Sequence, residues 1–297
     1  MDVLETEMPV ARPFGSLIDG ASDFGAIPRK ADQMSGVYMG NDVVMTRLWS
    51  DHSFLASTRD MIVTPNLINI GMVEPHNSRL IVSLIGPGDV VVDIGANTGY
   101  YSVLGAWRAF PHGQIWSFEP NPAAYALLSD NLHNNGFGAI AHRHRLALSN
   151  RQGETTLRVF PGYEATSTIR DVSRAFVDHT ERETGRPSHE VVVPVDTLDN
   201  IMRDCPAIDF IKIDAEGHEP EIIDGAQQIL ARSKNLKMLM EFVPPILDDG
   251  KARAMLAMLR AIGLTIYRFD NDANLTRYDD DDALMRFDFS DLFLTRR

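Results

Sequence analysis

Residues 90–102 read Val-Val-Val-Asp-Ile-Gly-Ala-Asn-Thr-Gly-Tyr-Tyr-Ser and join an acidic side chain to a glycine turn. The apolar run before Asp93 shows no polar alternation, which predicts a strand buried on both faces, as in a parallel sheet. Gly95 and Gly99 would let the backbone of the turn come close to a ligand. The helical pattern behind them offers free N–H groups. The segment therefore predicts a cofactor cradle at the carboxyl end of a strand.

The spacing of the glycines separates the candidate cofactors. A dinucleotide fingerprint needs three glycines, but Asn97 and Tyr100 occupy the second and third of those positions. The ending of a phosphate-binding loop, Gly-Lys-Ser or Gly-Lys-Thr, is also missing. The carboxylate of Asp93 would repel a pyrophosphate and attract an ammonium group. S-adenosylmethionine carries an ammonium, a sulfonium and a ribose diol but no phosphate, so the pattern favours this cofactor over NAD.

A second apolar segment, residues 114–118, ends in another acidic residue, Glu119. It lies about one helix and one strand beyond the glycine turn, near the offset at which an acidic residue meets a ribose in Rossmann-type units. Asn121 followed by Pro122 predicts a helix start, with Asn as the N-cap and Pro at the first helical position. Glu119 is therefore a candidate for binding the ribose hydroxyls.

A third apolar strand ends at Asp214, and a helix is predicted to begin near Pro220. In a doubly wound sheet, ligands bind beyond the carboxyl ends of the strands. This strand end should therefore face the same crevice as the first two. It would bring Asp214, Glu216 and His218 close to the position of methyl transfer.

If the acceptor of the methyl group is a hydroxyl, its attack requires a proton acceptor at this site. The unperturbed pKa of His218 suits a general base at neutral pH. Asp214 could instead take the proton or orient the nucleophile. In the alternative interpretation, Glu216, His218 and Glu219 are only an acidic first turn that stabilises the helix N-terminus.

Glu241 ends the next predicted strand, so it could join Asp214 in binding a divalent metal through carboxylate oxygens. Two carboxylates on neighbouring strands are common, and the sequence shows no tight set of ligands. We therefore predict no metal site. The run from Asp279 to Asp282 lacks the spacing of a calcium-binding loop and is interpreted as a solvated turn.

The composition fits an enzyme that acts on small molecules. The 297 residues carry a formal net charge of −13, which disfavours a nucleic-acid substrate. The single cysteine, Cys205, excludes an intrachain disulfide and a zinc site with several thiolates. Apolar runs are too short to span a membrane, and the first residues lack a signal-peptide pattern. We expect a cytoplasmic protein without membrane contact, and we leave open a homo-oligomer.

Strands and helices alternate from residue 89 onward, which predicts an α/β fold with a mostly parallel, doubly wound sheet. The predicted strands are 90–94, 114–118, 139–147, 207–213, 236–242, 264–269 and 286–294, and the predicted helices are 99–110, 122–134, 197–203, 219–231 and 248–262. The last two strands, with no clear helix between them, are interpreted as an antiparallel hairpin.

The remaining segments are predicted to surround this core, which is expected to occupy residues 81–297. Residues 1–80 are interpreted as an N-terminal extension or cap, with residues 1–40 as loop, short helix or flexible chain. Beyond them we expect strands at Val43–Trp49 and Ser53–Thr58, a helix capped by Thr64, and a helix over 75–85. Residues 160–189 form an insertion that is either a disordered loop or a substrate lid.

Five blocks of the sequence resemble the FkbM family of S-adenosylmethionine-dependent methyltransferases. They are Asp93-Ile94-Gly95-Ala96-Asn97-Thr98-Gly99-Tyr100, Phe118-Glu119-Pro120-Asn121, Leu146-Ala147-Leu148-Ser149, Val195-Asp196-Thr197-Leu198-Asp199 and Ile211-Lys212-Ile213-Asp214-Ala215-Glu216-Gly217. The resemblance extends from about residue 42 to the C-terminus. It implies the Rossmann-like class I methyltransferase fold, with a seven-stranded, mostly parallel sheet closed by a C-terminal antiparallel hairpin.

The resemblance also implies residue roles. Asp93, Gly95, Asn97 and Gly99 would hold the methionine part of the cofactor, Glu119 would bind the ribose with Asn121 beside it, and Ala147 and Ser149 would lie near the adenine edge. Asp214 would belong both to the cofactor site and, with His218 and Glu216, to the catalytic group. Glu74 matches a family position close to the pocket, although it could equally be a helix-entry charge.

The resulting hypothesis is O-methylation of a hydroxyl on a small molecule, natural product or sugar. The resemblance implies both the preference for oxygen and the class of acceptor, which would be a small molecule or a glycan. An N-methyltransferase that acts on an amine or peptide stays open. A nicotinamide-dependent oxidoreductase and a non-catalytic binding protein are less favoured, the first because of the failed glycine spacing.

Overall fold

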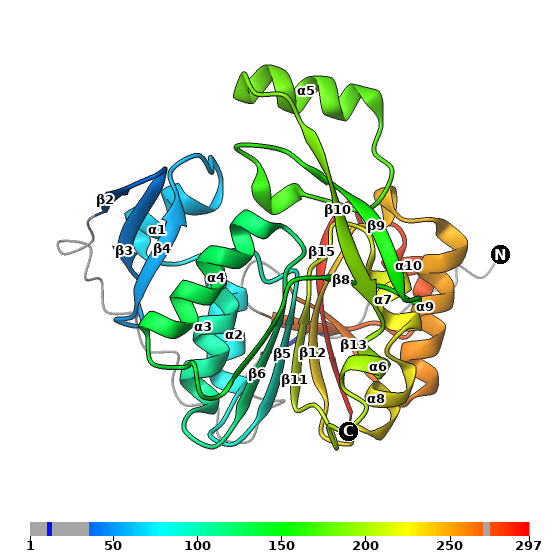
Figure 1. Cartoon of the computed structure of the whole chain (residues 1–297). Helices are drawn as coiled ribbons and strands as arrows, with labels where there is room; N and C mark the ends of the chain where they lie inside the picture. The colour runs from blue at the N-terminus through cyan, green and yellow to red at the C-terminus, as the bar shows by residue number, and fades with distance from the viewer. Residues whose placement is uncertain (1–10, 14–35, 270–273, 297) are drawn as a thin grey trace.

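The computed structural model describes residues 11–13, 36–269 and 274–296, and a central sheet organises them (Figure 1). The order of its nine described strands is β1-β14-β13-β15-β12-β11-β5-β6-β7. Their bounds are β1 Ala11–Pro13, β5 Val90–Ile94, β6 Gln114–Phe118, β7 Ala141–His144, β11 Phe210–Ile213, β12 Lys237–Phe242, β13 Thr265–Phe269, β14 Asn274–Arg277 and β15 Ser290–Thr295. The strands from β12 to β7 pair in parallel, so their carboxyl ends share one edge.

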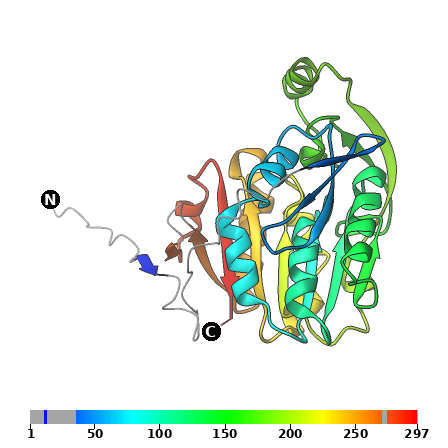
Figure 2. The same ribbon diagram turned by 90° about the vertical axis from the view of Figure 1, so that its left-hand side faces the viewer.

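Helices cover both faces of this sheet, as the alternating pattern predicts (Figures 1 and 2). One face carries α2 Pro75–Leu84, α3 Tyr100–Ala109 and α4 Pro122–Asn134, and the other carries α6 Leu198–Ile201, α7 Glu219–Asp224, α8 Gln227–Arg232 and α9 Asp249–Ala261. Successive residues of a strand face opposite sides. Val91 therefore packs into the core under α3, while Val92 packs into the core on the other face.

All seven predicted core strands are present, but the sheet has more strands than predicted, because β14 pairs with β13 at one edge and β1 pairs with β14. The C-terminal hairpin also differs from the prediction. The strand β15 does pair antiparallel with β13, yet β14 and the short helix α10 (Asp281–Leu284) lie between them along the chain. The side chain of Asp280 caps that helix by accepting the N–H of Asp282. The acidic run is therefore partly a helix start rather than a simple turn.

The predicted helix over 219–231 is two helices, α7 and α8. A Cβ on Gly225 would lie 2.0 Å from the carbonyl oxygen of Ser149, so the chain passes very close to a neighbouring loop at the break. The carboxylate of Asp199 then accepts the N–H groups of Gln228 and Ile229 and starts α8 anew. A cap that comes from a distant residue leaves no local signal in the helix itself.

The segment before the core forms a small antiparallel sheet that packs beside α4 (Figure 1). Its strands are β2 Val37–Gly40, β3 Val43–Arg47 and β4 Ser53–Ser57, followed by helix α1 Val63–Ile70. Asp60, rather than Thr64, starts α1, because its carboxylate accepts the N–H groups of Ile62, Val63 and Thr64. The predictions for residues 1–10 and 14–35 lie outside the described residues.

Residues 160–189 fold into an arm at the carboxyl edge of the sheet, topped by α5 (Figure 1). The arm contains a short 3-10 helix, η3 (Glu164–Thr166), and α5 (Arg174–Thr184). It rises from the sheet β8-β10-β9, whose strands are β8 Ala147–Leu148, β9 Gly153–Val159 and β10 His189–Asp196. The segment is therefore ordered, and its role as a substrate lid stays a prediction. Within the described residues, no helix is long and apolar enough to cross a membrane.

Candidate active site

A pocket of about 340 Å³ opens at the carboxyl ends of β5, β6, β11 and β12, where parallel sheets place their ligands. It brings together most of the residues predicted from sequence. Those that line it are Glu74, Gly95, Asn97, Glu119, Ala147, Asp214, Glu216 and His218. Asp93, Gly99, Asn121 and Ser149 are not lining residues, but each is next to a lining residue in the chain.

The glycine turn after β5 has the conformation that its sequence requires. Gly95, Asn97 and Gly99 all have positive φ, at +75°, +48° and +90°. A Cβ on Gly95 would lie 1.7 Å from the carbonyl oxygen of Asp214, so only glycine lets the two strand ends meet. A Cβ on Gly99 would lie 2.6 Å from the Leu128 side chain, and this residue therefore shapes the turn without facing the pocket.

Glu119 joins the glycine turn to the next helix. One carboxylate oxygen accepts the N–H of Asn97 and the other accepts the N–H of Asn121, each at 2.7 Å. Burial raises the pKa of Glu119 to about 7. The side chain of Asn121 accepts the N–H of Ala123 and caps α4, as predicted. The residue predicted to bind the ribose thus also holds the turn that would cradle the cofactor.

Asp93, which was predicted to contact the cofactor ammonium, is buried and does not line the pocket. One oxygen of its side chain accepts the Ser102 hydroxyl at 2.6 Å. The other oxygen has no hydrogen-bond partner within the described part of the chain. Burial raises the pKa of Asp93, while the ammonium of Lys212 on the neighbouring strand lowers it.

Lys212 is a pocket residue that the sequence analysis missed. Its ammonium lies 2.9 Å from a carboxylate oxygen of Asp214 and 4.6 Å from the ring centre of Tyr101. Burial by itself would lower the pKa of Lys212, but the nearby carboxylates of Asp214, Asp93 and Glu74 raise it above its usual value. The available signal was a charged residue inside an otherwise apolar strand.

Glu74 was predicted either as a pocket residue or as a helix-entry charge, and the structure gives it both positions. It precedes α2 with a left-handed backbone (φ 42°) and lines the pocket. Its carboxylate accepts the Tyr101 hydroxyl at 2.6 Å and the Asn77 amide at 3.1 Å. Asn77 also donates to Asp291 on β15 at 3.0 Å, so these polar groups form one connected network.

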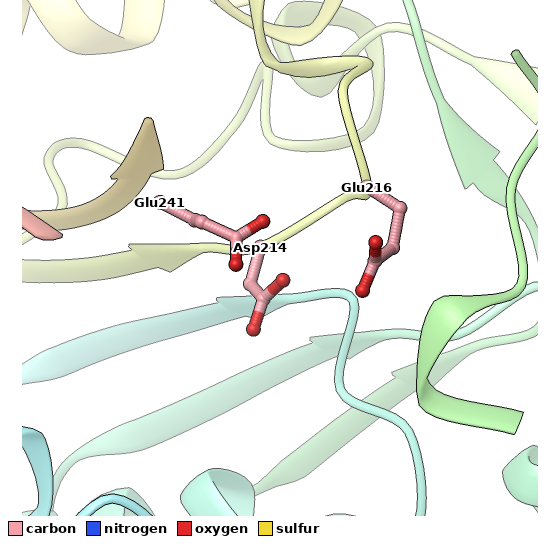
Figure 3. Close-up of side chains that lie close together, drawn as sticks. All are labelled: Asp214, Glu216 and Glu241. Carbon is pink, nitrogen blue, oxygen red and sulfur yellow. The ribbon is translucent and has the colours of Figure 1, made fainter. Parts of the chain in front are cut away.

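Three carboxyl groups converge on the floor of the pocket, from the ends of β11 and β12 (Figure 3). Asp214, Glu216 and Glu241 each offer an oxygen within 4.8 Å of the others, a tighter set than the sequence indicated. Burial raises the pKa of Glu216 to about 8 and that of Glu241 to about 10, and the carboxylate of Asp214 adds to both shifts. Carboxylate oxygens can hold a hard cation, but an ammonium already contacts Asp214.

His218 lies at the edge of the pocket and is supported from behind. Its Nε2 lies 3.0 Å from the Ser149 hydroxyl, and its Nδ1 lies 3.6 Å from a carboxylate oxygen of Glu221. Burial lowers the pKa of His218, which favours the neutral ring. Ser149, predicted near the adenine edge, contacts His218 from outside the lining, whereas Ala147 lines the pocket. The site therefore offers His218 and Glu216 as groups that could accept a proton.

The family model of the methyltransferase FkbM domain matches residues 93–263, which include the glycine turn, Glu119 and the carboxyl floor. This chain belongs to the FkbM methyltransferase family. The match covers more than half of the chain and confirms the resemblance seen in the sequence blocks.

Two curated relatives carry methyltransferase names. Methyltransferase sdnD of Sordaria araneosa is 28% identical over 157 residues, which are 46% of this chain and 60% of that protein. The 31-O-demethyl-FK506 methyltransferase FkbM of Streptomyces tacrolimicus is 26% identical over 204 residues, 61% of this chain and 74% of that protein. The AMB antimetabolite synthetase AmbE of Pseudomonas aeruginosa is 25% identical over 215 residues, 62% of this chain but only 10% of that protein.

Solved structures include more distant neighbours. Cofactor-bound Rv0187 from MTB matches 76% of this chain and 82% of its own, with 15% identity and a TM-score of 0.43. The TYW2 protein of P. horikoshii in complex with MeSAdo matches 88% of this chain and 74% of its own, with 11% identity and a TM-score of 0.43.

Proposed function

We propose that this protein transfers the methyl group of S-adenosylmethionine to a hydroxyl of a small molecule, natural product or sugar. The observation that carries the proposal is the pocket formed by the glycine turn, Glu119 and the carboxyl floor, within the segment that matches the family. Six acidic side chains line it, namely Glu74, Glu119, Glu164, Asp214, Glu216 and Glu241. Among the described lining residues the single Lys or Arg is Lys212, which is paired with Asp214.

This donor set fits a cationic cofactor without phosphate. The tight backbone of the glycine turn would lie against the methionine part, and the acidic walls would stabilise its positive charges. Glu119 would accept the ribose hydroxyls while keeping its bonds to the N–H groups of Asn97 and Asn121, since each carboxylate oxygen has two acceptor sites. The bound cofactor supplies an electrophilic methyl group on a sulfonium.

The acceptor hydroxyl must lose its proton as its oxygen attacks that methyl group. Glu216 points into the pocket beside Asp214, and its pKa of about 8 makes it a base in the weakly alkaline range, where the carboxyl has lost its proton. His218 is a second candidate base, since burial favours its neutral form. Lys212 would balance the charge of Asp214 during proton transfer.

The lining also restricts the acceptor. Among the described lining residues the one Lys or Arg, Lys212, already pairs with Asp214, so the pocket offers no free positive charge to a phosphate or carboxylate group, and nucleic acids and anionic metabolites are poor acceptors. Ile62 and Val63 at the start of α1 and Ile169 on the arm add apolar surface to the same pocket. An acceptor with an apolar body and a neutral hydroxyl fits these walls. An amine acceptor would also fit an acidic floor, and the product analysis below separates the two.

Binding should be measured first, by titration calorimetry with S-adenosylhomocysteine and with NAD. We expect binding of the first ligand only, and a loss of about 10- to 100-fold in affinity for Glu119→Ala, as for a hydrogen bond to a charged group. Glu154→Ala is the control, because this glutamate is exposed on β9. Unchanged affinity in Glu119→Ala, or binding of NAD alone, would contradict the proposal.

Transfer can then be followed with S-adenosylmethionine that carries a trideuterated methyl group and a panel of alcohols, sugars and amines. Mass spectrometry of the product locates the label on oxygen or on nitrogen. Label on oxygen supports the proposal, and label only on nitrogen would replace it with N-methylation. Cofactor binding without label in any product would favour a binding protein.

A further inference from the structure

The turn that carries Glu216 has a backbone that ordinary residues avoid. Glu216 has a φ of 53°, in the left-handed region, and Gly217 follows with a φ of 90°. Non-glycine residues rarely adopt this conformation unless surrounding contacts impose it. The left-handed turn places the Glu216 carboxyl beside those of Asp214 and Glu241 (Figure 3).

The contact that imposes the turn comes from Glu219, the first residue of α7. One oxygen of its carboxylate accepts the N–H of Ala215 at 2.9 Å and the N–H of Gly217 at 3.2 Å. These two N–H groups flank Glu216 on both sides. The side chain of Glu219 is 2% exposed and does not line the pocket, so it acts on the turn from behind.

The arm holds the same turn from the opposite side. The hydroxyl of Thr168 donates to the carbonyl of Glu216 at 3.1 Å, and Nε of Arg170 donates to it at 3.4 Å. A Cβ on Gly217 would lie 2.8 Å from Nε of Arg170, so the turn and the arm are in direct contact. The backbone of Glu216 is therefore fixed by two independent groups.

We propose that Glu219 is a positioning residue for methyl transfer, because its buried carboxylate shapes the turn that aims Glu216 at the acceptor hydroxyl. The inference rests on the proposed function, in which Glu216 accepts the proton. Thr168 completes the support from the arm. Its hydroxyl thereby couples the arm to the position of Glu216.

Two variants separate the reach of Glu219 from its charge. Glu219→Gln keeps an acceptor oxygen at the same distance without the charge, whereas Glu219→Asp keeps the charge on a side chain that is one methylene shorter. With the acceptor found in the transfer experiment, we expect Glu219→Asp to lower kcat by about tenfold or more, with the KM for S-adenosylmethionine within about threefold. Glu219→Gln should keep kcat within about threefold of the wild-type value.

A second readout needs no acceptor. Hydrogen exchange at the amides of Ala215 and Gly217 should be at least about tenfold faster in Glu219→Asp and close to the unchanged rate in Glu219→Gln, with β5 and β12 unaffected. Thr168→Val against Thr168→Ser tests the arm in the same way, since only serine keeps the hydroxyl. Thr168→Val should lower kcat, and it supplies the answer if Glu219→Asp does not fold.

Loss of kcat in Glu219→Gln with little change in Glu219→Asp would mean that the charge matters rather than the bonds to the turn, and the positioning role would be overturned. Equal losses in both variants would contradict the role too, because Glu219→Gln keeps the acceptor oxygen. A higher KM for the cofactor at unchanged kcat would overturn it as well. If the unchanged protein binds no S-adenosylhomocysteine, the proposed function fails, whereas the exchange rates still report on whether Glu219 holds the turn.

Discussion

The backbones of Gly95 and Asp214 pass so close together in the site that no side chain fits between them. This close approach brings the glycine turn after β5 against the carbonyl that precedes the Glu216 turn, so the cofactor side and the proposed proton-acceptor side share one contact. A side chain at position 95 would have to push two buried strand ends apart. Under the proposed function, Gly95 would therefore link the cofactor side of the pocket to the side of the proton acceptor, although it has no functional group of its own.

Gly95→Ala should abolish binding of S-adenosylhomocysteine and destabilise the fold by about 3 kcal/mol or more, since the clash adds to the left-handed backbone cost. Gly136→Ala is the control, because Gly136 also has a positive φ of +80° but open space where a Cβ would be. It should cost only about 1 kcal/mol and leave binding intact. Calorimetry and chemical denaturation measure both effects, and equal losses in the two variants would contradict the steric argument.

The carboxyl floor allows a prediction about metal. Lys212 already contacts Asp214, so an ammonium occupies one side of the carboxyl cluster. A divalent cation needs anionic oxygens. We therefore expect excess EDTA to leave turnover at pH 7 within about twofold of the untreated value. Loss of activity that added Mg²⁺ restores would show that the floor binds metal.

At the scale of elements, Asn131 on α4 connects the N-terminal sheet to the glycine turn. Its amide donates to the carbonyls of Leu55 on β4 and Thr98 in the turn, and its oxygen accepts the N–H of Leu55. Asn135, one helical turn later, makes a similar pair of bonds to Ser53 at the exposed end of the strand. The two asparagines thus make comparable contacts at different depths.

Asn131→Ala should lower the free energy of unfolding by about 2–4 kcal/mol, because it leaves buried polar groups unpaired. Asn135→Ala should cost less than about 1 kcal/mol, since water can replace its bonds. Urea denaturation gives both values. Similar costs in the two variants would mean that β4 is held mainly by apolar packing around Phe54.

The elements also show what local sequence could predict. The strands and the first two site blocks follow from apolar runs and glycine spacing, which act within a few residues. The start of α8 depends on Asp199, which is 29 and 30 residues away from the N–H groups it accepts. The convergence of Glu216 with Glu241 depends on a left-handed turn held by Glu219, so it could not be read from spacing. The insertion at residues 160–189 was predicted, but helix α5 within it was not, because its sequence is mostly polar and it buries few residues, among them Val177 and Thr180.

At the scale of the whole molecule, the acidic site sets the pH dependence of stability. Burial raises the pKa values of Glu119 and Glu219 to about 7, that of Glu216 to about 8 and that of Glu241 to about 10. The unfolded chain has lost these protons well below pH 6.5, because free glutamate has a pKa near 4.3. The folded state therefore binds more protons than the unfolded state, and stability must fall as the pH rises.

The melting temperature of the free protein should accordingly fall between pH 6.5 and pH 9. A loss on the order of 3 kcal/mol corresponds to a decrease of roughly 5–10 °C. The lowered pKa values of the buried histidines, including His218, act in the opposite direction, but mainly below about pH 7.5, where unfolded imidazoles with a pKa near 6.5 still bind protons. Replacing both Glu119 and Glu219 by Gln should make the slope shallower, because two of the titrating groups are gone. Calorimetric scans across this range test the argument, and a melting temperature that rises toward pH 9 would contradict the burial of these acids.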